Sequence, residues 1–283
     1  MILVTGATGT VGSIVVRLLR ERGEPVRAMT RNPDRRGPDA VFGDFDDAAS
    51  LVAAAREASA VFLLSAPGAT LPAHDLAMTR AAVAAGAGRI VKLSAIGTPD
   101  EPTEGLGSWH QPGEQAVRTS GVPWTILRPT TFASNTLSWR DAILAGEPIE
   151  NMFGDGRQGI VDPVDVAAVA VAALTGAAHE GRTYTLTGPG LLSVPDQVRI
   201  LGDILARPLS TVDLPIATAR ERMLAAGMPA SFVDVVVDGA ALVRRDGNAV
   251  TTDDVPTVLG RPARDFAAWA REHADAFKSR STR

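Results

Sequence analysis

Three glycines near the start of the sequence are the residues best placed to do chemistry. They occur in Gly6-Ala7-Thr8-Gly9-Thr10-Val11-Gly12, after a short apolar segment and before an amphipathic one. Gly6 allows a tight turn, Gly9 lets the backbone approach a pyrophosphate, and Gly12 lets a helix pack closely on a strand. Amides at the start of that helix then face phosphates. We therefore expect a dinucleotide site formed by Gly6, Thr8, Gly9, Thr10, Val11 and Gly12; a glycine turn without a ligand is the alternative.

The end of the next apolar segment indicates which dinucleotide to expect. Proteins that bind NAD usually carry an acidic residue about 20 positions after the glycines, where it holds the ribose 2′-hydroxyl. Here the segment ends Met29-Thr30-Arg31-Asn32-Pro33, which offers no carboxylate. A guanidinium at Arg31 can pair with a 2′-phosphate. Arg35 and Arg36 either add charge or are solvated loop residues. The sequence favours NADPH over NADH as the cofactor.

Further cofactor contacts are expected after the later strands. Asp44 can reach the adenine amino group and Phe45 can pack near the ring, although Asp44 and Asp46 could instead cap the next helix. Ser65-Ala66-Pro67 should line the nicotinamide ribose or the edge of the pyrophosphate. Pro129 should approach the carboxamide.

Strand and helix patterns alternate along the first half of the chain. Strands are expected at 1–5, 25–30, 40–43, 60–65, 89–94, 124–128 and 182–187. Helices are expected at 11–22, 46–57, 73–85, 111–119 and 163–174. The alternation predicts an α/β Rossmann fold, a doubly wound parallel sheet in the order 3-2-1-4-5-6, with the strand at 182–187 returning to its edge.

The second half predicts a small, mostly helical C-terminal substrate lobe. Its helices are expected near 195–205, 216–226, 229–241, 251–259 and 263–277. We expect 1–130 with 157–188 to form the dinucleotide-binding domain, and 131–156 with 189–283 to form the lobe.

The order and spacing of several motifs resemble one protein family. They read GATGTVG, VRAMTRNP, GDFDD, KLSAIG, HQPGEQAVRTSGVPWTILRPTTFASN, DPVDVAAVAVAAL and YTLTGP. Together, from position 1 to about 190, they resemble the NmrA-like branch of the atypical short-chain dehydrogenase/reductases. The resemblance implies a Rossmann fold with a small C-terminal substrate lobe. Members of this branch include NAD(P)H-dependent quinone reductases, regulators that sense NADP without catalysis, and enzymes that tailor aromatic metabolites.

The same resemblance shows a departure from ordinary short-chain reductases, which use a Tyr acid four residues before a Lys. The single tyrosine here is Tyr184, far too late in the chain. Ser94 aligns with the usual catalytic serine, and His110 and Glu114 occupy the sites of Tyr and Lys. His110 and Ser94 are therefore the candidate catalytic residues, with His110 donating a proton from an ordinary pKa near 6.5. The alternative is that His110 caps the helix while Glu114 reaches an exposed partner one turn on; Arg128 is expected to pair internally.

This departure favours a particular acceptor. Reducing a simple ketone creates an alkoxide, which needs a good acid nearby, whereas reducing a quinone creates a stabilised anion. We expect an NADPH-dependent reductase of a quinone-like or conjugated aromatic substrate. The alternatives are a non-catalytic sensor of NADP(H) and a tailoring enzyme of aromatic natural products.

A flat substrate would need an aromatic wall. The candidates after Pro129 are Phe132, Asn135, Trp139 and Phe153, with Met152 beside Phe153. Trp109 is expected to close the opposite side. The alternative for each is packing in the core of the lobe.

Composition limits the other classes of function. The chain has 283 residues, a net charge of -4 and no cysteine, which argues against nucleic-acid partners, disulfides and thiolate chemistry. The four histidines lack metal-ligand spacing, so no metal is expected. No apolar run is long enough to span a membrane and no signal peptide is apparent, so we expect a cytoplasmic protein without membrane contact. A small aromatic or quinone substrate is the expected partner, and a homodimer is left open.

Overall fold

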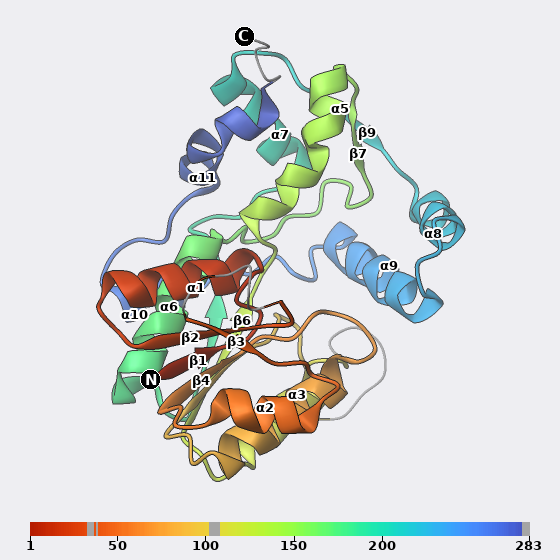
Figure 1. Cartoon of the computed structure of the whole chain (residues 1–283). Coiled ribbons are helices and arrows are strands. Elements are labelled where there is room, and N and C mark those ends of the chain that lie inside the picture. Colours follow the sequence, from red (N-terminus) through yellow and green to blue (C-terminus); the bar gives the residue numbers. More distant parts are fainter. Residues whose placement is uncertain (33–36, 38, 102–107, 279–283) are drawn as a thin grey trace. The chain divides into compact units, whose positions relative to one another are not determined.

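A seven-stranded parallel sheet forms the centre of the N-terminal part of the chain (Figure 1). The computed structural model describes residues 1–32, 37, 39–101 and 108–278. The strand order is β3-β2-β1-β4-β5-β6-β8, and every pairing is parallel. The strands are β1 (Ile2–Val4), β2 (Val26–Thr30), β3 (Ala40–Phe42), β4 (Ala60–Leu63), β5 (Ile90–Leu93), β6 (Trp124–Pro129) and β8 (Arg182–Leu186). This confirms the predicted Rossmann order and the return of the last strand to the edge.

Helices cover both faces of this sheet, which explains its apolar strands. One face carries α1 (Thr10–Glu21) and α6 (Pro163–Thr175), which pack on each other, and the other carries α2 (Ala48–Ala55) and α3 (Leu71–Ala84) (Figure 1). Helix α4 (Gln111–Arg118) packs beside α3. Every residue of β4 and β5 is consequently buried, as expected for strands enclosed on both sides.

The cap of α2 differs from the predicted one. The Asp47 carboxylate accepts hydrogen bonds from the amides of Ala49 and Ser50 and starts the helix. Asp44, which the sequence offered as a cap, instead accepts a bond from the amide of Asp46 at 3.2 Å. The capping role therefore falls one residue after Asp46, and the Asp44 side chain holds the turn that follows β3.

The chain divides into two units. The first comprises Met1–Pro129, Pro163–Leu186 and Asp254–Gly260, and the second comprises Thr130–Asp162, Thr187–Asp253 and Arg261–Arg283. Helix α10 (Asp254–Leu259), which the sequence assigned to the lobe, thus belongs to the first unit. It packs on α6 and β8, and the Asp254 carboxylate accepts a bond from the amide of Thr185 at 2.7 Å. An acidic helix start thereby covers part of an edge strand.

The second unit is mostly helical, as predicted. Its elements are a 3₁₀ helix (Ala133–Trp139), α5 (Arg140–Ala145), β7 (Ile149–Asn151), α7 (Val194–Leu205), β9 (Thr211–Asp213), α8 (Ile216–Ala225), α9 (Ala230–Arg244), α11 (Phe266–Glu272) and a 3₁₀ helix (Ala274–Phe277). Its core gathers around Trp269, Phe266, Phe277 and Leu201. The pair of short parallel strands, β7 and β9, was not predicted.

No helix in the described part of the chain is long and apolar enough to cross a membrane.

Candidate cofactor-binding and active site

The order of the strands reverses between β1 and β4, and ligands of doubly wound sheets bind beyond the carboxyl ends of the strands at this point. The glycine stretch follows β1, and the segment Leu64–Gly68 follows β4. Both segments therefore border the place where the fold puts a ligand.

The glycine stretch has the geometry that a pyrophosphate requires. Gly6 has φ +58°, and a Cβ on it would lie 2.7 Å from Leu64 Cγ. A Cβ on Gly12 would overlap the carbonyl oxygen of Gly6, so α1 can approach the loop only with glycine there. Gly9 is the N-cap of α1 and offers no side-chain cap, and Thr8 and Thr10 beside it are exposed. Amides at an uncapped helix start suit an anionic phosphate, so these residues fit a dinucleotide.

Strand β1 and the segment after β4 are tied together below this loop. The hydroxyl of Thr5 accepts a bond from the amide of Leu64 at 2.8 Å. It also lies 3.0 Å from the carbonyl oxygen of Leu64 and 3.1 Å from that of Phe62, to which it can donate. These hydrogen bonds fix the start of the glycine loop against the end of β4.

The residues proposed for the adenosine end follow β2 and β3. Arg31 is exposed directly after β2, while Arg35 and Arg36 lie outside the described residues. Phe45 stacks on the ring of His74, with centroids 5.1 Å apart and an interplanar angle of 17°. The imidazole of His74 also lies 3.2 Å from the Asp46 carboxylate. Phe45 is therefore held by a neighbour on α3.

The residues proposed for the nicotinamide end differ in what their side chains do. Ala66 and Pro67 are exposed after β4. The hydroxyl of Ser65 points inward, where it donates to Asp75 at 2.7 Å, so a cofactor contact here would fall to its backbone. Pro129 is buried at the end of β6, and its carbonyl oxygen accepts a bond from the amide of Ile96 at 3.0 Å.

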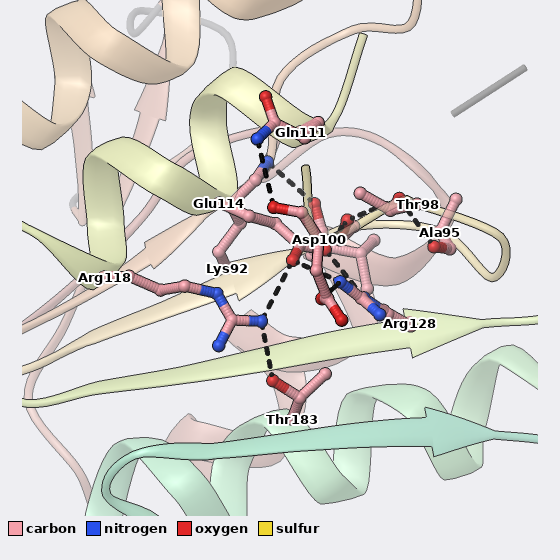
Figure 2. Close-up of polar contacts among 11 residues, drawn as sticks. Lys92, Ala95, Thr98, Asp100, Gln111, Glu114, Arg118, Arg128 and Thr183 are labelled. Carbon is pink, nitrogen blue, oxygen red and sulfur yellow. Dashed lines mark hydrogen bonds and ion pairs between the residues drawn. The ribbon is translucent and has the colours of Figure 1, made fainter. Parts of the chain in front are cut away.

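A buried carboxylate, that of Glu114 on α4, accepts hydrogen bonds from several polar side chains next to this end of the sheet (Figure 2). It accepts bonds from Ser94 Oγ at 2.6 Å, from Arg128 Nε at 2.9 Å and Nη2 at 2.7 Å, and from Arg118 at 3.2 Å. Arg128 also pairs with Asp100 at 3.1 Å. The predicted internal pairing of Arg128 is confirmed. Arg118 lies one turn after Glu114, where the alternative reading expected an exposed partner, but it is half-buried.

These bonds set the charge of Glu114. Burial pushes its pKa upward, but the hydrogen bonds from Arg128 and Ser94, the positive charge of Arg128 and the bond from Arg118 together hold the pKa below its usual value. Glu114 is therefore an anion that anchors neighbouring cations rather than a proton donor.

The two candidate catalytic residues are not poised as acids. Ser94 is buried and its hydroxyl proton is engaged by Glu114. His110 precedes α4 at the N-cap position but makes no capping bond with its side chain, and its Nδ1 is buried without a hydrogen-bond partner among the described residues. Burial and the positive charge of Lys92 lower the pKa of His110 from 6.5 to about 3, although Glu114 opposes the shift. The pKa of His110 therefore departs from the ordinary value expected from the sequence, and its role as a proton donor stays a prediction.

A buried ion pair was not predicted from the sequence. Lys92 on β5 and Asp75 on α3 pair with each other, and their side chains are only 1% and 0% exposed. Lysine is almost never fully buried unless it is paired. Its position inside the apolar strand Ile90–Leu93 was therefore a signal that a carboxylate must lie nearby.

The proposed substrate residues fall in both units. Trp109, in the first unit, is half-buried. In the second unit, Trp139 and Phe153 pack against the hydrophobic core, which is the alternative that the sequence left open for them. Phe132 is half-buried at the start of the 3₁₀ helix, and Asn135 is exposed.

No group of His, Cys, Asp or Glu side chains that could hold a metal ion occurs among the described residues.

Comparisons with known proteins settle the family. A sequence profile described as NAD(P)H-binding matches residues 6–177, well over half of the chain. The chain belongs to the NAD(P)H-binding family. The glycine stretch lies at the start of this match, in agreement with the dinucleotide site and with the NmrA-like resemblance.

Curated relatives extend over nearly the whole chain. One relative, from Streptomyces griseus subsp. griseus, is 42% identical over 98% of this chain and 99% of its own; it is named (4-alkanoyl-5-oxo-2,5-dihydrofuran-3-yl)methyl phosphate reductase. A second, the NAD(P)H azoreductase of Xenophilus azovorans, is 37% identical over 98% of this chain and 99% of its own. Both relatives are named as reductases, and this member of the NAD(P)H-binding family is an NAD(P)H-dependent oxidoreductase.

Solved structures share the fold. The NADPH-dependent quinone oxidoreductase of Escherichia coli, crystallised with NADPH, superimposes with a TM-score of 0.83 at 24% identity, covering 96% of this chain and 99% of that one. The triphenylmethane reductase of Citrobacter sp., crystallised with NADP(H), gives a TM-score of 0.83 at 22% identity, covering 97% of this chain and 100% of that one.

Proposed function

We propose that this protein transfers hydride from NADPH to an electron-poor conjugated acceptor, either a quinone or a compound with a double bond conjugated to a carbonyl group. The observation that carries this proposal is the state of the two residues at the expected position of an acid. Ser94 is bonded to an anion, and His110 has a pKa of about 3.

The acid requirement separates the possible acceptors. The reduced nicotinamide supplies the hydride. An isolated ketone then becomes an alkoxide and needs a proton from a nearby acid during the transfer. A quinone or a conjugated carbonyl becomes a delocalised anion, which can take its proton from water. The neutral imidazole of His110 can still hydrogen-bond such an anion without giving up a proton.

The names of the two relatives support this class of acceptor. The dihydrofuran in the name of the Streptomyces griseus relative is a ring with an oxo group and a double bond, and azo compounds contain a nitrogen–nitrogen double bond. Both are unsaturated groups that accept hydride without first forming a simple alkoxide.

We further propose that NADPH is preferred over NADH, because Arg31 is exposed at the end of β2, where it can meet a 2′-phosphate. Arg31→Ala should weaken NADPH binding about tenfold and leave NADH binding within about twofold, measured by calorimetry. Arg22→Ala, which removes an exposed arginine at the other end of α1, is the control. An equal loss for both cofactors would argue against the assignment.

The acceptor class is tested with an anaerobic panel. Purified protein with NADPH is mixed separately with menadione, an α,β-unsaturated lactone and a saturated ketone of similar size. We expect loss of the reduced-nicotinamide absorbance with the first two and none with the third. Rapid reduction of the saturated ketone would overturn the proposal. Tight NADPH binding without reduction of any acceptor would favour a sensor of NADP(H).

A further inference from the structure

One buried carboxylate, that of Asp75 on α3, joins four segments of the first unit. Its Oδ1 accepts the bond from Ser65 Oγ at 2.7 Å, and its Oδ2 pairs with Lys92 on β5. A Cβ on Gly113 of α4 would overlap the same carboxylate, so α4 packs directly against it. The backbone oxygen of Asp75 also accepts the hydroxyl bond of Thr79, within α3.

Stability alone does not account for an ion pair at this depth. Removing two charges from water is costly, and replacing a buried ion pair by apolar side chains of similar shape is often neutral or stabilising. Met78 and Ile90, close to Asp75 and Lys92 in the sequence, are both fully buried. The pair is therefore better explained by a role in fixing the positions of neighbouring groups. Directed hydrogen bonds can fix such positions, whereas an apolar contact cannot.

The segment that Asp75 fixes lies beside the cofactor loop. Ser65 is followed by the exposed Ala66 and Pro67. On its other side, Leu64 is bonded to Thr5 and blocks any side chain at Gly6. The segment after β4 is thus held on one side by Thr5, which follows β1, and on the other by the buried Asp75.

We propose that Asp75 is a positioning residue that fixes the turn Ser65–Gly68 against the glycine loop and thereby sets the affinity for the nicotinamide half of the cofactor. Lys92 holds the Asp75 carboxylate in the orientation that Ser65 needs. The inference rests on the proposed NADPH site and requires no particular acceptor.

The test separates positioning from stability. The double variant Asp75→Leu/Lys92→Met keeps the shapes of both side chains and removes both charges, so it should fold with a Tm close to that of the wild type. It should bind NADPH about tenfold more weakly, because the Ser65 hydroxyl loses its acceptor. Adenosine 2′,5′-bisphosphate, which lacks the nicotinamide half, should bind within about twofold of wild type.

A second variant keeps the ion pair intact. Ser65→Ala removes only the hydroxyl and should give a smaller loss of NADPH affinity, together with faster amide exchange at Ala66 and Gly68. Ser120→Ala, which removes a hydroxyl that donates to the carbonyl oxygen of Val117 at 2.8 Å in the turn between α4 and β6, is the matched control. Binding is measured by calorimetry without any acceptor.

Each outcome bears on the proposal. A folded double variant or Ser65→Ala variant with wild-type NADPH affinity would overturn the positioning role, as would an equal loss for NADPH and for adenosine 2′,5′-bisphosphate. A wild-type protein that binds no NADPH would overturn this inference and the proposed function together. A wild-type protein that binds NADPH but reduces no acceptor would overturn the proposed acceptor class alone.

Discussion

Replacing Glu114 by glutamine tests how much the buried anion stabilises the first unit. The substitution keeps the size of the side chain but removes its charge, and it places an amide nitrogen where one carboxylate oxygen accepts bonds from Arg128 and Arg118. We expect a loss of about 3 kcal/mol in the free energy of unfolding.

The magnitude follows from the contacts. The carboxylate is 3% exposed and accepts four hydrogen bonds, three of them from guanidinium groups. A hydrogen bond to a charged group contributes roughly 1.5–3 kcal/mol when its partner stays buried. Arg128 and Arg118 are 16% and 30% exposed, so water recovers part of the loss. Glutamine also retains one acceptor oxygen, so only the bonds from Arg128 Nη2 and Arg118 to the other oxygen are lost. The expected loss of about 3 kcal/mol is the lower end of the sum for these bonds.

Thermal unfolding measures this loss. About 3 kcal/mol corresponds to a fall of roughly 6–10 °C in Tm for a chain of this size. Trp124 offers a local probe, because the guanidinium of Arg118 lies 4.7 Å from its ring centroid. Glu180→Gln, which breaks the pair of the exposed Glu180 with the half-buried Arg89 at 3.7 Å, should change the stability by less than about 0.5 kcal/mol. A Glu114→Gln protein as stable as the wild type would refute the reasoning.

The same variant makes a prediction about pH. The pKa of Glu114 is lower in the folded protein than its usual value of 4.5. Its contribution to stability is therefore fully present above pH 4.5 and is lost as the pH falls through the lower, folded-state pKa. The difference in Tm between wild type and Glu114→Gln should shrink with acidification below pH 4.5. A difference in Tm that stays constant would mean that the charge of Glu114 does not cause the loss of stability.

Other predictions follow from individual residues. Gly12→Ala places a Cβ against the carbonyl oxygen of Gly6 and should abolish NADPH binding in calorimetry, whereas Gly190→Ala, which meets open space, should leave binding unchanged. Retention of affinity by Gly12→Ala would contradict the close approach of α1. The ring protons of His110 should show no titration between about pH 5 and pH 8 in NMR spectra, because its pKa lies at about 3. A midpoint near the ordinary 6.5 would restore His110 as a candidate acid.

Most strands of the first unit could be predicted because they are short apolar runs bounded by glycine, proline or a polar turn, whereas β8 (Arg182–Leu186) was predicted from its β-forming residues. β4, with the sequence Ala60-Val61-Phe62-Leu63, is an example. β7 and β9 could not be predicted: each has three residues, and Ile149 pairs with Thr211, so their pairing depends on the folded lobe rather than on local periodicity. Helix α10 was assigned to the wrong unit because its contacts with α6 lie far away in the sequence.

The site could be predicted as far as backbone geometry determines it. The tight turn at Gly6 and the close approach at Gly12 could be predicted from their spacing and their place between a strand and a helix. The protonation of His110 could not be predicted, because it depends on burial and on Lys92, which comes from another strand. The Asp75–Lys92 pair joins residues 17 positions apart, and only the unusual lysine within a buried strand pointed to it.

A single-turnover experiment tests whether this protein transfers hydride directly from NADPH to a conjugated acceptor. Protein loaded with NADPH is mixed anaerobically with menadione, and the loss of reduced-nicotinamide absorbance is followed with ordinary NADPH and with NADPH deuterated at the transferred position. We expect one NADPH to be consumed for each quinone reduced and a slower reaction with the deuterated cofactor. Bound NADPH that remains reduced in the presence of menadione and of an α,β-unsaturated lactone would contradict it.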